Sequence, residues 1–158
     1  MTPRADVLGL AMLAACAVPA ARPPASVAFD TAAVWIRQGS DSTRLGVELA
    51  TSPTQHEVGL SGRPSLDPDS GMLFVFDSRR LGGDGFQMWQ TRMPLDIAFI
   101  DGEGVILRIL SMEPCAAASA LDCPGYYPSV EYARALEVNR GWFAAHAIDA
   151  GAVVRIEE

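Results

Sequence analysis

The sequence predicts a mainly β domain, arranged as a sandwich or a barrel of about eight short strands with one or two short helices. Two observations carry this prediction. Short apolar runs recur along the chain, and turns rich in glycine, proline and aspartate separate them. The chain of 158 residues fits a single domain, which we expect to occupy residues 31–158.

The first half of this domain contains three apolar segments and one helix start. Residues 34–36 predict an edge strand, and residues 45–50 alternate as a half-buried strand does. Residues 52–55, Ser-Pro-Thr-Gln, are typical of a capped helix N-terminus, so a short helix is expected from there to about residue 60. Residues 72–76 are continuously apolar, which predicts a strand covered on both faces.

The second half contains further short apolar segments, each bounded by a turn. We expect strands at residues 86–90, 95–100, 105–110, 133–139 and 153–156, and one helical turn at residues 142–147. The Asp-Gly-Glu-Gly sequence at residues 101–104 predicts a hairpin between the second and third of these strands.

The N-terminus predicts export. Residues 1–15 combine a basic start at Arg4, a short apolar stretch and small residues before Cys16, as a secretory signal peptide does. The four residues ending at Cys16, Leu-Ala-Ala-Cys, resemble the bacterial lipobox, whose cysteine is acylated and becomes the first mature residue. We therefore expect a lipid anchor at Cys16, a linker rich in alanine and proline at residues 16–30, and a position facing the periplasm or the exterior. The alternative is a soluble periplasmic or secreted protein cleaved after Ala20.

The two remaining cysteines, Cys115 and Cys123, lie in one proline-rich loop. In an oxidising compartment they are expected to form a structural disulfide, which stabilises so short a loop by about 2–3 kcal/mol. A redox-active pair is the alternative, although such pairs more often have two intervening residues. The spacing does not fit a zinc site.

The charged residues exclude several classes of function. The formal net charge is −7, and such an acidic surface repels phosphate backbones, so nucleic acid is not an expected partner. All 12 basic residues are arginine. Without lysine, the chain has neither the lysine of a P-loop nor the amine that Schiff-base catalysis requires.

Four ordered sequence blocks indicate a family. They are Gly59–Arg63, Gly71–Phe76, Thr91–Asp101 and Leu136–Trp142. Together they resemble the family called domain of unknown function 192, which is found in bacteria and archaea. The resemblance covers residues 45–156 and implies a compact, jelly-roll-like β fold without a known substrate. Gln87 stands where the family usually has tryptophan, and Trp89 and Gln90 stand where it usually has lysine and asparagine.

Two carboxylates lie between apolar residues and are candidates for a site. Asp96 and Glu137 are expected on one face of strands whose other face is apolar, with Arg63 as their partner and Thr91 and Asn139 nearby. One interpretation is a buried ion pair that joins the helix to the sheet. The other is the floor of a pocket, where Arg63 binds an anionic or hydroxylated ligand.

The remaining polar and aromatic candidates are weaker. His56 is expected on a solvated helix face and His146 in a packed turn, so neither predicts a metal site, and no cofactor is expected. The exposed members of an aromatic set would form a surface for stacking sugars, with Tyr126 and Tyr127 the best placed. That set consists of Trp35, Phe86, Trp89, Tyr126, Tyr127 and Trp142.

These features favour a non-catalytic binding module of the cell envelope over an enzyme. Its ligand would be a small molecule, a glycan or a protein, bound in a polar pocket around Arg63, Asp96 and Glu137. The alternatives are a hydrolase or lyase acting on carbohydrate, with Asp96 and Glu137 as acid and base, and a purely structural scaffold.

Overall fold

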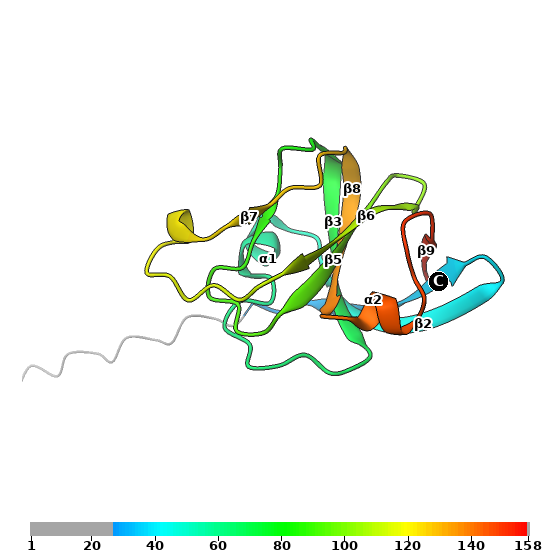
Figure 1. The fold of residues 1–158 in the computed structure, drawn as a ribbon, viewed down its shortest axis with the longest axis horizontal. Helices are drawn as coiled ribbons and strands as arrows, with labels where there is room; N and C mark the ends of the chain where they lie inside the picture. The colour runs from blue at the N-terminus through cyan, green and yellow to red at the C-terminus, as the bar shows by residue number, and fades with distance from the viewer. Residues whose placement is uncertain (1–26, 158) are drawn as a thin grey trace, which may run out of the picture.

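A computed structural model describes residues 27–157 of the chain (Figure 1). The predicted signal peptide, the lipidation site Cys16 and most of the expected linker lie outside the described residues. The first strand begins at Asp30, next to the expected boundary between linker and domain.

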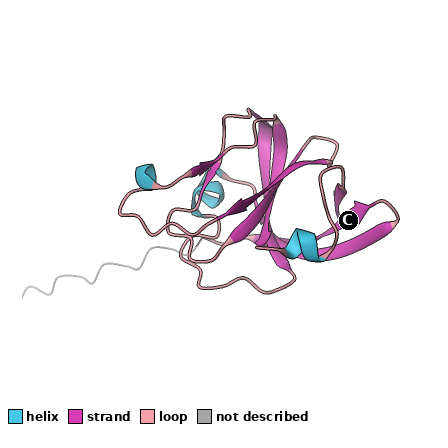
Figure 2. Cartoon of the chain, in the orientation of Figure 1, coloured by secondary structure: helices cyan, strands magenta, loops and turns pink. Residues whose placement is uncertain are grey.

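The described part of the chain is mainly β, as predicted, with nine strands and few helical residues (Figure 2). Seven strands form one sheet in the order β6-β5-β8-β3-β2-β1-β9. They are β1 (Asp30–Gln38), β2 (Asp41–Ala50), β3 (Ser70–Arg80), β5 (Leu95–Ile100), β6 (Ile106–Met112), β8 (Tyr132–Asn139) and β9 (Val153–Ile156). A separate small sheet pairs β4 (Phe86–Gln87) with β7 (Gly125–Tyr126), so the strand expected at residues 86–90 is shorter than predicted.

One short helix connects the parallel pair of the large sheet. Strands β2 and β3 are parallel, and α1 (Pro53–Val58) lies on the connection between them. Its start is the predicted capping box, in which Ser52 and Gln55 each accept a hydrogen bond from the other's backbone N–H. The other pairings of neighbouring strands in this sheet are antiparallel.

The large sheet curls, but it does not close into a barrel. Its two edge strands meet at one end, where Val105 and Val153 form an isolated bridge. There the backbone N–H of Val154 donates to the carbonyl of Gly104 over 2.7 Å. Gly104 has a φ of +91°. A Cβ atom at this position would lie 2.5 Å from the carbonyl oxygen of Val154. Only glycine permits this close approach.

Apolar side chains are buried on both faces of the sheet. Leu73, Ala98 and Leu136 belong to a core on the face that also packs against α2 (Trp142–Ala145). Met72, Ile97 and Phe99 belong to a second core, covered by Leu60 after α1 and by Met88. The continuous apolar runs of β3 and β5 therefore reflect burial on both faces, as predicted for residues 72–76.

The expectation of an edge strand at residues 34–36 is wrong. Strand β1 pairs with β2 on one side and with β9 on the other. The edge position belongs to β9, because the chain returns at its end to the strand with which it began.

Candidate functional site

The structure does not bring the five predicted site residues into one cluster. On the paired strands β5 and β8, Asp96 lies opposite Val138, whereas Glu137 lies opposite Ile97. Since neighbouring residues of a strand point to opposite faces, the two carboxylates lie on opposite sides of the sheet. The prediction that they share one face is therefore wrong, and they cannot flank a single substrate as acid and base.

Asp96 is buried and its hydrogen bonds are satisfied within the fold. The residue is 5% exposed. One carboxylate oxygen accepts from the Ser111 hydroxyl over 2.6 Å, and the other accepts from the backbone N–H of Gly141 over 2.7 Å. Gly141 precedes α2, so Asp96 joins β5, β6 and the start of this helix.

Glu137 is equally buried but has no such partners. It lies between Met72 of β3 and Ile97 of β5, and its residue is 5% exposed. Within residues 27–157 its carboxyl makes no hydrogen bond or ion pair. Burial alone raises its pKa to about 8. The carboxyl is therefore mostly protonated at neutral pH.

Arg63 pairs with a different acid from those predicted. Its guanidinium lies 2.5 Å from the Glu48 carboxylate and 5.5 Å from the centre of the Phe29 ring. The crossover between β2 and β3 places this arginine beside β2, a consequence of the parallel pairing that the residue pattern did not reveal. Asn139 donates to the carbonyls of Leu66 and Asp67, and so holds the same crossover.

Thr91 is buried in a different region. It is 6% exposed, and its backbone N–H donates to the carbonyl of Met88. It lines a cavity of about 760 Å³ beside the disulfide loop, residues 115–123, and Gly62 of the crossover lines this cavity too. Arg63 lines a different pocket, together with Glu48.

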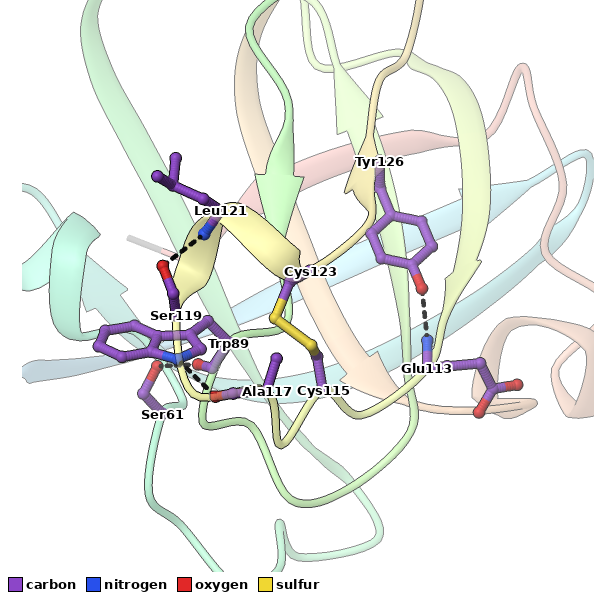
Figure 3. Close-up of a disulfide and its surroundings, with 9 residues drawn as sticks. All are labelled: Ser61, Trp89, Glu113, Cys115, Ala117, Ser119, Leu121, Cys123 and Tyr126. Atoms are coloured by element: carbon purple, nitrogen blue, oxygen red, sulfur yellow. Dashed lines mark hydrogen bonds between the residues drawn. A yellow bond between two sulfur atoms is a disulfide. The ribbon is translucent and has the colours of Figure 1, made fainter.

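The predicted disulfide between Cys115 and Cys123 is present (Figure 3). The loop it closes also holds Trp89, whose indole N–H donates to the carbonyl of Ala117 over 3.2 Å. The Ser61 hydroxyl donates to the carbonyl of Trp89 over 3.3 Å. Trp89 is thus fixed between the turn after α1 and the disulfide loop while 36% of its surface stays exposed.

A second polar pocket, which we call the α1 pocket, lies between α1, β3, β4 and the disulfide loop and has a volume of about 690 Å³. Its aromatic lining residues are Phe74, Phe76, Phe86, Trp89, Tyr127 and Tyr132, and its ionisable lining residues include His56, Glu57, Arg80 and Asp84. Three of the six aromatics predicted to stack on a sugar, Phe86, Trp89 and Tyr127, therefore meet here. The tyrosine expected beside Tyr127 does not line the pocket: the hydroxyl of Tyr126 accepts from the backbone N–H of Glu113.

Arg80 is one of the charged residues that line this pocket. Its guanidinium lies over the Phe76 ring, 5.3 Å from the ring centre. The Asp84 carboxylate is 3.5 Å from Nε, an ion-pair distance without the alignment of a hydrogen bond, and the buried Nε has no hydrogen-bond partner among the described residues. The Tyr132 hydroxyl donates to the carbonyl of Asp84, and burial raises the pKa of this phenol, against the opposing effect of Arg80.

His56 also lines this pocket. Its Nε2 lies 2.9 Å from the carbonyl of Ala50 and 3.1 Å from that of Val75. Two carbonyl oxygens require a donor, so Nε2 carries a proton. No described residue bonds to Nδ1. The expectation of a solvated helix-face histidine is wrong, because the ring folds back onto β2 and β3 and packs 4.7 Å from Phe76.

Sequence reasoning missed His56, Glu57, Arg80 and Asp84 as site residues. They come from two segments, α1 and the end of β3 with the loop after it, and no spacing in the sequence relates one segment to the other. The aromatic residues were the available signal. His146 is placed as predicted, in a turn with its ring against Trp142, 4.2 Å between centres. Between residues 27 and 157, no three histidine, cysteine or acidic side chains are grouped as they would be to hold a metal ion.

In the described residues, no helix is long and apolar enough to cross a membrane.

No curated protein matches this chain. Several solved structures are similar to it, among them the following two. A Sinorhizobium meliloti protein labelled a candidate transcription regulator is 29% identical, with a TM-score of 0.69, and the match covers 84% of this chain and 98% of that one. A Novosphingobium aromaticivorans protein of unknown function is 25% identical, with a TM-score of 0.71, and the match covers 89% of this chain and 94% of that one.

A family model for uncharacterised proteins, DUF192, matches residues 34–156, which includes all four sequence blocks and all but the first few residues of the described domain. The chain therefore belongs to the DUF192 family.

Proposed function

We propose that this protein is a non-catalytic module of the cell envelope that binds a small polar ligand in the α1 pocket. The supporting observation is the lining of this pocket, which combines six aromatic side chains with the polar side chains of Arg80 and His56.

The proposal moves the ligand from the predicted residues to a neighbouring region. Arg63 and Asp96 already have good internal partners, so a ligand would have to compete with Glu48 and with the Gly141 N–H. Arg80 has only a loosely aligned acid beside it. The volume of about 690 Å³ lies within the range of about 300–1,000 Å³ that is usual for small-molecule sites.

Export and anchoring at Cys16 are part of the same proposal. Their support is the leader sequence of residues 1–16, together with a disulfide of the kind that persists in oxidising compartments. The regulator label of the Sinorhizobium meliloti structure is not extended to this chain, because a net charge of −7 disfavours contact with nucleic acid. Intact-mass analysis of the native product is expected to give a chain that begins at an acylated Cys16. An uncleaved N-terminus with free thiols would overturn the anchoring.

The pocket is tested with the dye ANS, an aromatic sulfonate whose rings fit the aromatic lining and whose oxygens accept from Arg80. ANS fluorescence is expected to rise on binding to the folded protein, and amide shifts in NMR spectra are expected to map to β3 and β4. The substitution Arg80→Gln should weaken binding about tenfold or more, which corresponds to about 1.4 kcal/mol. Arg79→Gln is the matched control, because Arg79 is an exposed neighbour on the same strand. Equal binding by both variants would refute the role of Arg80, and absence of binding to the native protein would refute the pocket.

A further inference from the structure

We infer that the domain docks on a lipid surface through four exposed apolar side chains at the α1 pocket. They are Leu81, Trp89, Leu121 and Tyr127, and we call them the apolar rim. The inference rests on the anchoring at Cys16 in the proposed function, because the anchor brings the domain to a membrane. Three observations lead to it: where the exposed apolar side chains gather, where the described chain begins, and which charges lie beside the rim.

The exposed apolar side chains gather around one pocket. Among the described residues seven large apolar side chains are exposed, and four of them form the apolar rim. Trp89 and Tyr127 line the α1 pocket directly. Leu121 is adjacent to one lining residue, and Leu81 lies two residues before another. The two exposed residues of the β1–β9 pair, Trp35 and Ile156, lie elsewhere on the domain.

Leu121 projects from a restrained loop. It belongs to η1 (Ala120–Asp122), on the yellow loop at the end of the domain opposite to β9 (Figure 1). Leu121 is 93% exposed, and its side chain points away from the disulfide that closes the loop (Figure 3). Its backbone N–H donates to the Ser119 hydroxyl over 3.2 Å. Because the loop is ordered before docking, little conformational entropy is lost when the leucine is buried.

The described chain begins beside the same pocket. The Gln55 side-chain amide donates to the carbonyl of Ala28 over 2.8 Å, and the next residue of α1, His56, lines the pocket. Residues 17–26 separate Cys16 from the first described residue, and a fully extended chain of this length spans at most about 40 Å. A lipid anchor at Cys16 therefore keeps the end of the domain that carries the rim near the membrane. So short a tether gives a high effective concentration, at which a weak apolar contact is populated.

The chemistry of the rim fits the interface of a bilayer without anionic lipid. Tryptophan and tyrosine are enriched at membrane interfaces, because their rings are apolar and one end of each is polar. Carboxylates of Glu57, Asp84 and Asp122 lie beside the rim, against the guanidinium of Arg80. Anionic headgroups are therefore not attracted, and docking depends on burial of apolar surface.

The test places the full-length protein, anchored through Cys16, in phosphatidylcholine vesicles whose acyl chains carry bromine close to the headgroup. Bromine quenches tryptophan fluorescence at short range. Trp35→Phe is the background, because it leaves Trp89 at the rim and Trp142 in the core. We expect the brominated lipid to lower the fluorescence by about a third or more relative to unbrominated vesicles. Quenching that needs added phosphatidylglycerol and disappears in high salt would overturn the inference.

Variants in this background test the rim itself. Leu121→Ser is expected to reduce the quenching about twofold or more, and adding Leu81→Ser should reduce it further. Both side chains are largely exposed, so these substitutions leave the core intact. Ile156→Ser is the matched control, an exposed apolar residue on β9. Equal quenching in the double variant and in the control would overturn the inference.

Intact mass and flotation of the vesicles separate the docking from the anchoring. If the protein is acylated at Cys16 and floats with the vesicles, but brominated lipid leaves its fluorescence unchanged, the docking fails and the anchoring stands. A rim covered by residues 17–26 or by a protein partner gives this result. If the protein is not acylated and does not float, both fail.

Discussion

Glu137 gives the sharpest test of the energetics of this fold. Its carboxyl is buried between Met72 and Ile97 and has no partner in the described residues, so burial raises its pKa from 4.5 to about 8. At about 1.4 kcal/mol per pKa unit, ionising this carboxyl in the folded state costs about 5 kcal/mol. At pH 7, where the folded carboxyl is still mostly protonated, the cost to stability is about 3 kcal/mol.

The sign follows from proton binding. Between pH 4.5 and about pH 8 the folded state holds a proton that the unfolded state has released. The free energy of unfolding therefore decreases as the pH rises through this window, and it is highest, with respect to this group, below pH 4.5. The substitution Glu137→Gln keeps the shape of the side chain and removes the titration. We expect the variant to become more stable than the native protein as the pH rises, by about 3 kcal/mol at neutral pH.

The assay is urea unfolding followed by tryptophan fluorescence, with the disulfide oxidised, at a series of values from about pH 5 to about pH 9. Glu131→Gln is the control, because Glu131 is exposed and precedes the same strand. The control is expected to follow the native pH dependence. If Glu137→Gln also follows it, or if this variant is less stable than the native protein at pH 8, Glu137 is charged and paired, and the reasoning fails.

Three further predictions concern local structure. Reducing the bond between Cys115 and Cys123 is expected to lower the free energy of unfolding by about 2–3 kcal/mol and to weaken ANS binding, as measured by urea unfolding and dye titration; unchanged ANS affinity would separate the loop from the pocket. Gln90 has a φ of +59°, so Gln90→Asn is expected to stabilise the protein by about 0.5–1 kcal/mol, since asparagine tolerates this conformation better; a lower thermal midpoint would contradict this. Asp96→Ala is expected to cost about 2–4 kcal/mol in urea unfolding, because it leaves two donors unpaired, and Ser111→Ala should cost less. A larger loss in Ser111→Ala would reverse that assignment.

Much of the fold was predictable from local patterns. Residues 52–55 formed the expected capping box, the runs at residues 72–76 and 95–100 formed strands buried on both faces, and Cys115 formed the expected disulfide with Cys123. Each of these features depends on neighbours in the sequence or on two groups within one short loop. Their physical causes therefore act over distances that a sequence shows directly.

The site was not predictable in the same way. Asp96 and Glu137 look equivalent in sequence, each between two apolar residues, but the register of β5 and β8 sends them to opposite faces. A shift of one residue in this pairing would have placed both carboxylates on the same face of the sheet. Arg63 was expected to reach them, and instead it meets Glu48, because β2 and β3 are parallel.

The sequence by itself determined that the chain is mainly β, which segments form most of its strands, where its capped helix begins, which cysteines pair, and to which family it belongs. Only the tertiary structure decided which polar groups meet. The order of strands, the parallel pairing of β2 with β3 and the curl of the sheet bring His56 and Arg80 to one pocket beside Trp89 and Tyr127. Strand pairing over long separations in the chain is set by the packing of the whole core, whereas strand and turn formation is set by a few adjacent residues.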